Sequence, residues 1–272
     1  MSVAASVIVR CKDEAATIER TLRSVRAQTV DVEIIVVDSG SRDGSLEIAR
    51  RCCDTLIEIE PAEFSYGRAL NLGAKAASAP VHFALSAHCR PERSDWVERS
   101  LAHYERPHVA GTNGIQTFAD GSPVREPFAQ DAAQARSNPF WGFSNHASSW
   151  RANVWAQFPF NEQIEAAEDR EWSWRVLDAG WVLIFDPKIW VSLEHSWKGG
   201  LRNFYYRQRQ DRAAIGTFTA LPEYGLSELT QEWWRGTPAD GHSKLFHRLN
   251  PLRMAGLLGK YAGQRQAKAS GG

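Results

Sequence analysis

Residues 33–44 read Glu33-Ile-Ile-Val-Val-Asp38-Ser-Gly-Ser-Arg-Asp-Gly44, an apolar, β-branched run that ends in a loop of turn-forming residues. Such a run predicts a buried strand, and the loop predicts a sharp change of direction after Asp38. A similar run, Ser6-Val-Ile-Val-Arg10, comes earlier in the chain. Between the two, the spacing of Ile18, Leu22 and Val25 predicts a helix. The chain therefore begins as strand, helix, strand.

Strands and helical patterns continue to alternate up to residue 86. We expect a helix near 46–49, a strand over 55–60, a helix over 67–78 and a strand over 81–86. This alternation predicts an α/β fold with a mostly parallel central sheet flanked by helices. Because ligands of open α/β sheets bind beyond the carboxyl ends of the strands, the polar loop after each strand is a candidate site segment.

The pattern changes after about residue 106. Strands are expected near 109–118, 181–187 and 190–195, and helices near Glu168 and over 199–212. We predict one domain over residues 1–216, divided into halves of about 1–106 and 107–216, followed by a helical, basic extension over 217–272.

Composition and charge narrow the class of protein. The 272 residues are 43% apolar and 24% charged, as in ordinary globular proteins, and no apolar run approaches the ~20 residues of a membrane span. The four cysteines have no CxxC spacing, which favours a reducing cytosol. The chain carries 20 basic and 27 acidic residues up to Glu194, but 12 basic and 5 acidic residues from His195 onward. The basic end predicts either an anionic partner or a solvated tail.

Several common motifs are missing from the sequence. The loop after the first strand, Cys11–Thr17, has no GxGxxG pattern, and the chain has no Walker A, GxSxG or HExxH motif. Those absences argue against a dinucleotide-binding oxidoreductase, a P-loop nucleotidase and the commonest hydrolases.

Individual polar residues allow a functional and a structural interpretation. Asp38 could accept hydrogen bonds from a nucleoside or close an Asx turn. Arg68 could pair with a phosphate or simply lie at a helix start. The adjacent acids Glu168 and Asp169 could supply a general base or stabilise a helix N-terminus. His195 could bind a metal or a diphosphate, or be structural.

The motifs taken in order resemble those of the family 2 glycosyltransferases with the GT-A fold, especially the bacterial rhamnosyltransferase-like branch. The resemblance covers roughly residues 5–215. Its motifs are Ser6-Val-Ile-Val-Arg-Cys-Lys-Asp-Glu14, Ile35-Val-Val-Asp-Ser-Gly-Ser-Arg-Asp-Gly44, Phe64-Ser-Tyr-Gly-Arg-Ala-Leu-Asn-Leu-Gly73, Leu85-Ser-Ala-His-Cys-Arg-Pro91, Phe143-Ser-Asn145 and Glu168-Asp-Arg-Glu-Trp172.

This resemblance implies an inverting transfer of a sugar from a nucleotide diphosphate sugar to an acceptor hydroxyl. Asp169 matches the family's catalytic base, and Glu168 lies beside it. The first half of the domain would bind the nucleotide sugar through residues at the strand ends and in the helix over 67–78; they are Arg10, Asp38, Ser39, Arg68, Asn71, Ser86 and His88. The second half would bind the acceptor, with Trp141, Asn145 and Arg207 on that side.

One motif departs from the family pattern. Where family members usually carry a DxD motif that holds Mg²⁺ or Mn²⁺, this chain has Ser86-Ala87-His88. Three interpretations follow: His88 and His195 hold Mn²⁺ or a similar divalent metal, His88 contacts the diphosphate directly, or the protein is inactive. Imidazole suits transition metals better than it suits Mg²⁺.

The resemblance also bears on partners and location. A lipid-linked glycan acceptor, as in bacterial surface polysaccharide assembly, would explain a basic tail that docks a cytoplasmic enzyme on the anionic inner face of the membrane. The donor would be dTDP-rhamnose or a UDP-sugar, and no nucleic-acid partner is expected. Two competing hypotheses are a glycosyltransferase that decorates a small natural product and a non-catalytic partner protein that binds nucleotide sugars.

Overall fold

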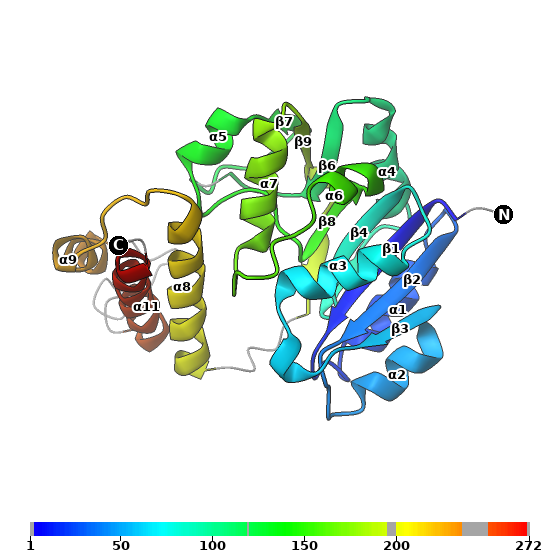
Figure 1. Ribbon diagram of the computed structural model, residues 1–272, viewed down its shortest axis with the longest axis horizontal. Helices are drawn as coiled ribbons and strands as arrows, with labels where there is room; N and C mark the ends of the chain where they lie inside the picture. The colour runs from blue at the N-terminus through cyan, green and yellow to red at the C-terminus, as the bar shows by residue number, and fades with distance from the viewer. Residues whose placement is uncertain (1–2, 119, 195–199, 236–249, 271–272) are drawn as a thin grey trace. The chain divides into compact units, whose positions relative to one another are not determined.

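The computed structural model describes residues 3–118, 120–194, 200–235 and 250–270 (Figure 1). Its contacts divide the chain into two compact units. The first comprises residues 1–163 and 168–195, and the second comprises residues 164–167 and 196–272. The boundary expected after residue 216 falls inside helix α8, Gly200–Phe218, which belongs to the second unit.

The first unit is built on an eight-stranded sheet with the order β3-β2-β1-β4-β8-β6-β9-β7. Strands β3, β2, β1 and β4 are parallel, and β6 and β9 are parallel to each other. β8 runs antiparallel between β4 and β6, and β7 runs antiparallel beside β9. The strands are β1 (Ala5–Cys11), β2 (Val32–Asp38), β3 (Thr55–Glu58), β4 (Val81–Ser86), β6 (Val109–Gly114), β7 (Phe128–Gln130), β8 (Ala147–Arg151) and β9 (Val182–Asp186).

Helices and short elements connect these strands. A separate two-stranded sheet pairs β5 (Cys89–Pro91) with β10 (Val191–Leu193). The helices of this unit are α1 (Ile18–Arg26), α2 (Ser45–Cys52), α3 (Tyr66–Ala76), α4 (Trp96–Ala102), α5 (Ala132–Ser137), α6 (Ala152–Gln157) and α7 (Glu168–Asp178), with short 3-10 turns at Pro61–Glu63, His103–Glu105 and Pro187–Ile189. The predicted mostly parallel sheet flanked by helices is therefore confirmed.

The core explains why β1 and β2 are almost wholly apolar. Successive residues of a strand point to opposite faces of a sheet. Val7 and Val9 join Leu22 of α1 in one buried cluster, whereas Ile8 lies against Gly73 of α3. A Cβ at Gly73 would come within 2.3 Å of the Ile8 side chain, so only glycine allows this close approach. Both faces are thus covered, and the strands read as continuous apolar runs.

Strand β8 begins inside residues 138–150, an aromatic stretch rich in asparagine and serine for which the sequence predicts no strand. Its serines are buried because their hydroxyls find partners inside the protein. Ser149 Oγ bonds Thr112 Oγ1 at 2.6 Å and the Tyr104 hydroxyl at 2.8 Å. Trp150 is fully buried, with its ring 5.0 Å from that of Phe160. Strand β8 is therefore a central strand of the sheet although its sequence contains few apolar residues.

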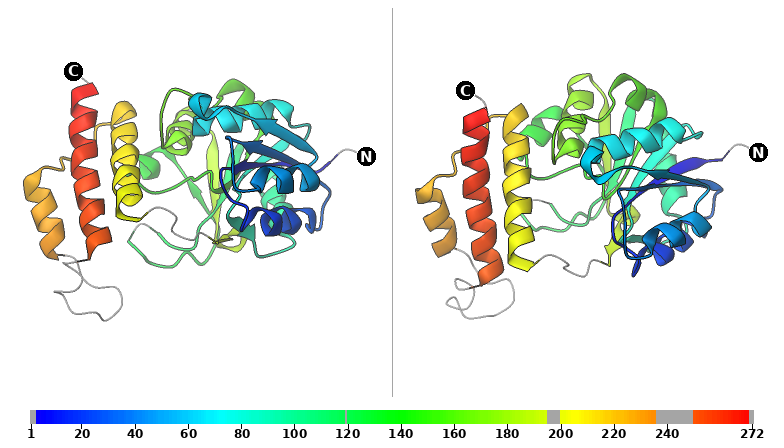
Figure 2. Two further views of the ribbon diagram at one scale, coloured as in Figure 1. Left: turned by 90° about the horizontal axis from the view of Figure 1, so that it is seen from below. Right: turned by 60° about the horizontal axis from the view of Figure 1, so that its bottom comes forward.

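The second unit consists, in its described part, of helices α8, α9 (Leu226–Arg235) and α11 (Pro251–Ser270). Figure 2 shows α8 and α11 side by side along their length. A helical C-terminal extension is therefore present. None of the helices in the described ranges combines the length and the apolar character needed to cross a membrane.

Candidate active site

The carboxyl ends of the parallel strands meet at one edge of the sheet. Arg10 of β1 lies in register with Ser86 of β4, and Cys11 lies in register with Asp38 of β2. Because β8 is antiparallel to β4, its first residue, Ala147, pairs with Leu85 at the same edge. The residues before β8 therefore join the strand ends that the sequence marks as a candidate site.

Two adjacent carboxylates face this edge from the start of α7. Glu168 is buried, and its Oε1 accepts hydrogen bonds from Arg10 Nη1 and Asn145 Nδ2, each at 3.4 Å. Asp169 Oδ2 accepts the main-chain N–H of Asn145 at 3.2 Å. Ala167, just before them, has a φ of +61°, an unusual left-handed conformation for a residue with a side chain. Such conformations cluster at functional sites.

The two carboxylates have different environments. Burial and the neighbouring charge of Asp169 raise the pKa of Glu168 to about 7, while Arg10 and the Asn145 amide oppose that rise. The Asp169 side chain is 16% exposed, against 6% for Glu168. Paired carboxyl groups whose environments differ in this way can divide acid and base roles between them. This arrangement suits Asp169 for accepting a proton from a bound hydroxyl.

Arg10 is held from three sides. Its Nη2 donates to the Asn145 carbonyl at 2.6 Å, its Nη1 faces Glu168, and its guanidinium lies 5.3 Å from the Tyr66 ring centre. Within the described ranges, Arg10 Nε and Arg170 Nη1 are buried and have no hydrogen-bond partner. Tyr66 and Arg170 are site residues that the sequence did not single out, although each lies within a quoted motif, Phe64–Gly73 and Glu168–Trp172, respectively.

Asp38 shapes the loop that follows β2. Its Oδ1 accepts the N–H groups of Gly40 and Ser41, and its Oδ2 accepts the Ser41 hydroxyl. The bonds from the following N–H groups form an Asx turn, and the carboxylate is almost fully buried. Ser39 is bound to the neighbouring strand, where its N–H donates to the Cys11 carbonyl at 3.1 Å. Both residues therefore lie at the predicted edge, and Asp38 uses its oxygens within the loop.

Arg68 and Asn71 lie on α3, whose N-cap is Ser65. Arg68 is half-exposed and forms ion pairs with Glu63 at 3.4 Å and Glu162 at 3.6 Å. Asn71 is buried, and its Nδ2 donates to the Phe160 carbonyl and to Glu162.

The Oδ1 of Asn71 accepts the Trp155 indole N–H and the Phe160 N–H. All four hydrogen-bonding positions of this amide are filled. In this structure Asn71 thus fastens α3 to residues 155–162.

His88 is paired with a carboxylate. Its Nδ1 lies 3.0 Å from Glu14 Oε1, and the Glu14 side chain is mostly buried at the start of the loop before α1. Ser86, two residues earlier, donates its N–H to the His146 carbonyl at 3.0 Å. His195, the second predicted metal residue, lies outside the described residues.

The resemblance implies a divalent metal, and the side chains of the site show whether they could bind one. Across the part of the chain that the structure describes, no three His, Cys, Asp or Glu side chains gather as a metal cluster. His88 and Glu14 provide one imidazole nitrogen and one carboxylate. A metal bound mainly by substrate phosphates and water needs only one or two protein ligands. The described residues alone therefore do not make a complete metal centre.

His146 is a further site residue that the sequence reasoning missed. Its Nδ1 bonds Ser144 Oγ at 2.6 Å, and burial lowers its pKa to about 4. The charges of Asp169, Arg10, Arg170 and His88 also act on its pKa, which places His146 among the other site residues. Its position next to Asn145 in the Phe143-Ser-Asn motif was the only available signal.

The predicted acceptor-side residues lie in different parts of the chain. The Trp141 ring lies 6.2 Å from that of Phe128 and 5.5 Å from that of Phe185, and these two rings also stack on each other at 5.3 Å. The Trp141 indole N–H donates to the Thr117 carbonyl. Asn145 contacts both carboxylates, as described above. Arg207 is an exposed residue of α8 in the second unit. Within the first unit, Asn145 is thus the predicted acceptor-side residue that contacts the described carboxylates.

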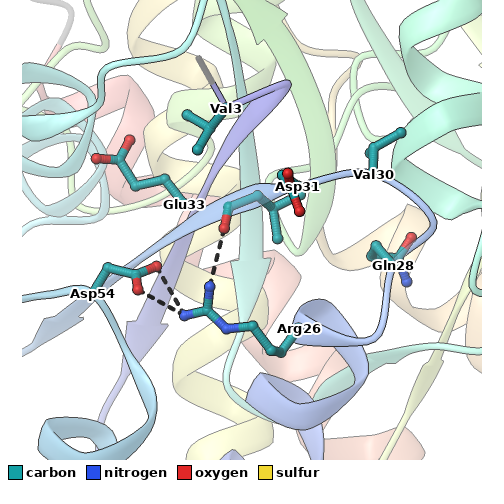
Figure 3. A pocket seen from close by; sticks show the side chains of 8 residues that line it. Val3, Arg26, Gln28, Val30, Asp31, Glu33 and Asp54 are labelled. Carbon is teal, nitrogen blue, oxygen red and sulfur yellow. Dashed lines mark hydrogen bonds and ion pairs between the residues drawn. The ribbon is translucent and has the colours of Figure 1, made fainter. Parts of the chain in front are cut away.

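A separate cavity of about 420 Å³ lies at the amino end of β2, away from this edge (Figure 3). Arg26 lies across it, with Nη2 bound to both oxygens of Asp54 and Nη1 bound to the Val32 carbonyl. Asp31, Glu33 and Asp54 give the lining more negative than positive charge. That balance makes the cavity unsuited to a diphosphate.

Comparisons with known proteins bear on the family and the fold of this chain. A family model described as glycosyl transferase family 2 matches residues 6–161, more than half of the chain. The glycosyltransferase AglE of Haloferax volcanii is 29% identical over 200 residues, which are 66% of this chain. The match spans 63% of the AglE length.

Solved structures show the same fold. The mannosyltransferase PcManGT from Pyrobaculum calidifontis, solved with GDP-Man and Mn²⁺, is similar over 99% of this chain and 74% of its own, with a TM-score of 0.64 and 17% identity. The glucosyl-3-phosphoglycerate synthase of Mycobacterium tuberculosis, solved with Mn²⁺ and UDP, is similar over 79% of this chain and 78% of its own, with a TM-score of 0.57 and 16% identity. These likenesses confirm the GT-A fold.

Proposed function

Because the chain belongs to glycosyl transferase family 2, we propose that it transfers a sugar from a nucleotide diphosphate sugar to an acceptor hydroxyl, with Asp169 as the base. The observation that carries the proposal is the pair of carboxylates at the carboxyl edge of the sheet. Asn145 contacts both of them, and Asp169 is the more exposed of the two.

The proposed step forms one bond and breaks another. The acceptor oxygen attacks the anomeric carbon while its proton passes to the Asp169 carboxylate. The bond from that carbon to the diphosphate oxygen breaks, and the nucleoside diphosphate leaves with the electron pair. Attack from the face opposite the leaving group inverts the anomeric centre. The leaving diphosphate gains negative charge, so cationic groups near it stabilise the transition state.

The donor would lie along the strand ends. Ser39, Arg68, Ser86 and His88 are the residues that we propose for direct contact, supported by their placement at this edge or on α3. Asp38 would act through the turn that it closes, and Asn71 through the segment that it anchors. Arg170 Nη1 adds a buried cationic donor that lies 4.0 Å from Asp169 and has no hydrogen-bond partner among the described residues.

A divalent metal, Mn²⁺ or Mg²⁺, is part of the proposal, with His88 as one ligand and His195 as another. When bound, such a metal neutralises charge on the diphosphate. The Mn²⁺ present with PcManGT and with the Mycobacterium tuberculosis synthase supports a metal in general. In the alternative to this metal site, His88 contacts the diphosphate directly.

Proteins with this fold bind different donor sugars. The TarS protein of Staphylococcus aureus, solved with UDP-GlcNAc, has a TM-score of 0.56 and 16% identity to this chain, so neighbours of the same fold differ in their donors. We propose dTDP-rhamnose or a UDP-sugar as donor and a lipid-linked glycan as acceptor. Trp141, Asn145 and Arg207 remain the proposed acceptor-side residues.

A donor screen tests the proposal. Thermal unfolding is measured with UDP-, dTDP-, GDP- and CMP-sugars, each with Mn²⁺, with Mg²⁺ or with EDTA. We expect stabilisation by one donor class, because a ligand that binds only the folded state raises its stability. Stabilisation that is lost in EDTA supports the metal. Stabilisation that persists in EDTA supports direct contact between His88 and the diphosphate.

Asp169→Asn then tests the chemistry with the donor so found. The variant removes the base but keeps the shape, so turnover should fall by at least about 10²-fold while nucleotide affinity stays unchanged. Asp178→Asn is the matched control, because Asp178 lies on the same helix and forms an exposed ion pair with Arg136. Donor binding without turnover in the unmodified protein would instead favour a non-catalytic, nucleotide-sugar-binding partner, which the Ser86-Ala87-His88 departure motivates.

A further inference from the structure

The guanidinium of Arg10 reaches across the site to the carboxylate pair rather than into the loops of the strand ends. Its Nη1 lies 3.4 Å from Glu168 Oε1, and its Nη2 donates to the Asn145 carbonyl at 2.6 Å. Asn145 in turn donates its main-chain N–H to Asp169 and its side-chain amide to Glu168. One side chain is therefore linked to both carboxylates, directly to Glu168 and through one residue to Asp169.

We propose that Arg10 is a positioning residue that fixes the orientation of the Glu168–Asp169 pair for proton transfer. The inference rests on the proposed function, and it moves Arg10 from the predicted donor-binding set to the support of the base. A guanidinium suits this place because its planar fork reaches two acceptors at once. The Tyr66 ring at 5.3 Å and the main chain of β1 hold it from the other side.

The link through Asn145 is itself restrained. Ser148 Oγ donates to Asn145 Oδ1 at 2.8 Å, so the side-chain amide is held with its Nδ2 toward Glu168. The carbonyl and the N–H of Asn145 point to Arg10 and Asp169, respectively. Asn145 is buried, and so are Glu168 and Ser148. A displacement of Arg10 would therefore be transmitted to the Asp169 carboxylate.

The charges around Glu168 and Asp169 agree with a positioning role for Arg10. Glu168 faces Arg10 from β1 and Asp169 from its own helix. Arg170 Nη1 lies 4.0 Å from Asp169 Oδ2. The charges of Asp169 and of His88 both act on the pKa of His146. Arg10 favours the ionised form of Glu168 and so opposes the effects of burial and of Asp169. Loss of Arg10 should make the pair hold its proton to higher pH.

The test compares Arg10→Gln and Arg10→Lys with the unmodified protein. We expect turnover to fall about 10²-fold in both, because neither side chain can hold Glu168 and the Asn145 carbonyl together. In Arg10→Gln the acidic limb of the kcat/KM profile should move up by about one pH unit, and Arg10→Lys, which keeps the charge, should move it less. Donor affinity should stay within about twofold of the unmodified value, as for a residue that does not touch the donor.

Arg23→Gln is the matched control, since it removes a guanidinium from an exposed ion pair with Glu19 on α1. Circular dichroism establishes that each variant is folded, and Arg10→Lys keeps the comparison possible if Arg10→Gln does not fold. A tenfold loss of donor affinity with an unchanged pH profile would overturn the proposal and return Arg10 to the donor-binding set.

A second measurement separates this proposal from the proposed function. Carbon-13 NMR of the side-chain carboxyl groups follows the titration of Glu168 and Asp169 in the protein without substrate. A titration that changes in Arg10→Gln supports the positioning role even if no donor is turned over, in which case the proposed function alone fails. Identical carboxyl titrations in the unmodified protein and both Arg10 variants would overturn the positioning role while leaving any transferase activity intact.

Discussion

His82 is a buried histidine of β4 whose ring is enclosed by aromatic side chains. Its ring centre lies 6.2 Å from that of Trp150 and 6.1 Å from that of Trp155. In the described part of the molecule neither ring nitrogen has a hydrogen-bond partner. Burial lowers the pKa of His82 from 6.5 to about 4. The folded protein thus holds this imidazole neutral at a pH where the unfolded chain protonates it.

This difference predicts acid sensitivity. The neutral state of His82 contributes its full stability above pH 6.5, and that contribution is lost as the pH falls toward 4. A shift of this size corresponds to about 3 kcal/mol at the acidic end. In His82→Phe the free energy of unfolding, measured in urea between pH 4 and 7, should fall less steeply than in the unmodified protein. His108→Asn, at an exposed position, should leave the slope unchanged, and equal slopes for His82→Phe would contradict the prediction.

Single residues differ in how far the sequence alone could place them. The adjacent acids Glu168 and Asp169 stand out in a short motif, and the structure places both at the sheet edge expected for a ligand. The contact of Glu168 with Arg10 joins residues 158 positions apart, which no local pattern shows. The four internal hydrogen bonds of Asn71 are equally invisible in the sequence, because an amide reads the same whether its partners are protein groups or a ligand.

At the scale of elements, the parallel strands were predictable and β8 was not. Strands β1, β2 and β4 are buried on both faces, so their sequences are nearly continuous apolar runs. Strand β8 reads Ala-Ser-Ser-Trp-Arg and lacks such a run. Its serines satisfy their hydroxyls with Tyr104, Thr112 and Asn145, three contacts made only after folding. Hydrogen bonds made in the folded protein therefore allow these serines in a buried strand, and the sequence of β8 lacks the apolar run by which such a strand is predicted.

Helix α11 packs on α8 through glycines. A Cβ at Gly259 would come within 2.4 Å of the Tyr205 carbonyl oxygen, and one at Gly263 would come within 2.5 Å of the Arg209 carbonyl oxygen. At Gly256 the nearest atom, at 2.7 Å, is in the ring of Phe204. A side-chain ring can turn away, whereas a helix carbonyl cannot move without displacing the helix. The three positions thus differ in what alanine would have to displace.

Gly259→Ala is therefore expected to destabilise the α8–α11 pair by about 1–3 kcal/mol, as overpacking does, although alanine is the better helix former. Gly256→Ala is the matched substitution in the same helix and should cost less, because only the Phe204 ring must move. Urea unfolding followed by far-UV circular dichroism measures both free energies. A stabilised Gly259→Ala variant would show that the two helices do not approach as closely as the structure has them.

At the scale of the whole molecule, the charges are divided unevenly along the chain. From His195 onward the chain has 12 basic and 5 acidic residues. The main part of the second compact unit begins at the next residue, Ser196. Some of these basic groups are neutralised locally: Lys260 pairs with Glu232 and Lys268 with Glu223, each at 2.7 Å. Leu252 and Leu258 are exposed on the same helix. The second unit therefore exposes both basic and apolar groups, which docking on an anionic surface would require.

Vesicle binding tests this surface in the full chain. We expect sedimentation with phosphatidylglycerol vesicles, little with phosphatidylcholine vesicles, and release by salt, because each basic residue near an anionic surface contributes about 1 kcal/mol. Combining Arg265→Glu with Lys268→Glu on α11 should weaken binding by at least about 30-fold, because reversing both charges makes this end of the helix more negative by four units even though Lys268 is paired with Glu223.

The matched control is Arg50→Glu combined with Arg51→Glu on α2, which makes the same change of charge on the first unit. Net charge alone would weaken vesicle binding equally in the two double variants, whereas a docking surface on the second unit predicts loss only in the α11 variant. Equal weakening, or equal binding to both kinds of vesicle, would contradict membrane docking through α11. The basic groups would then serve solvation of the second unit, and the proposed lipid-linked acceptor would lose its support from charge.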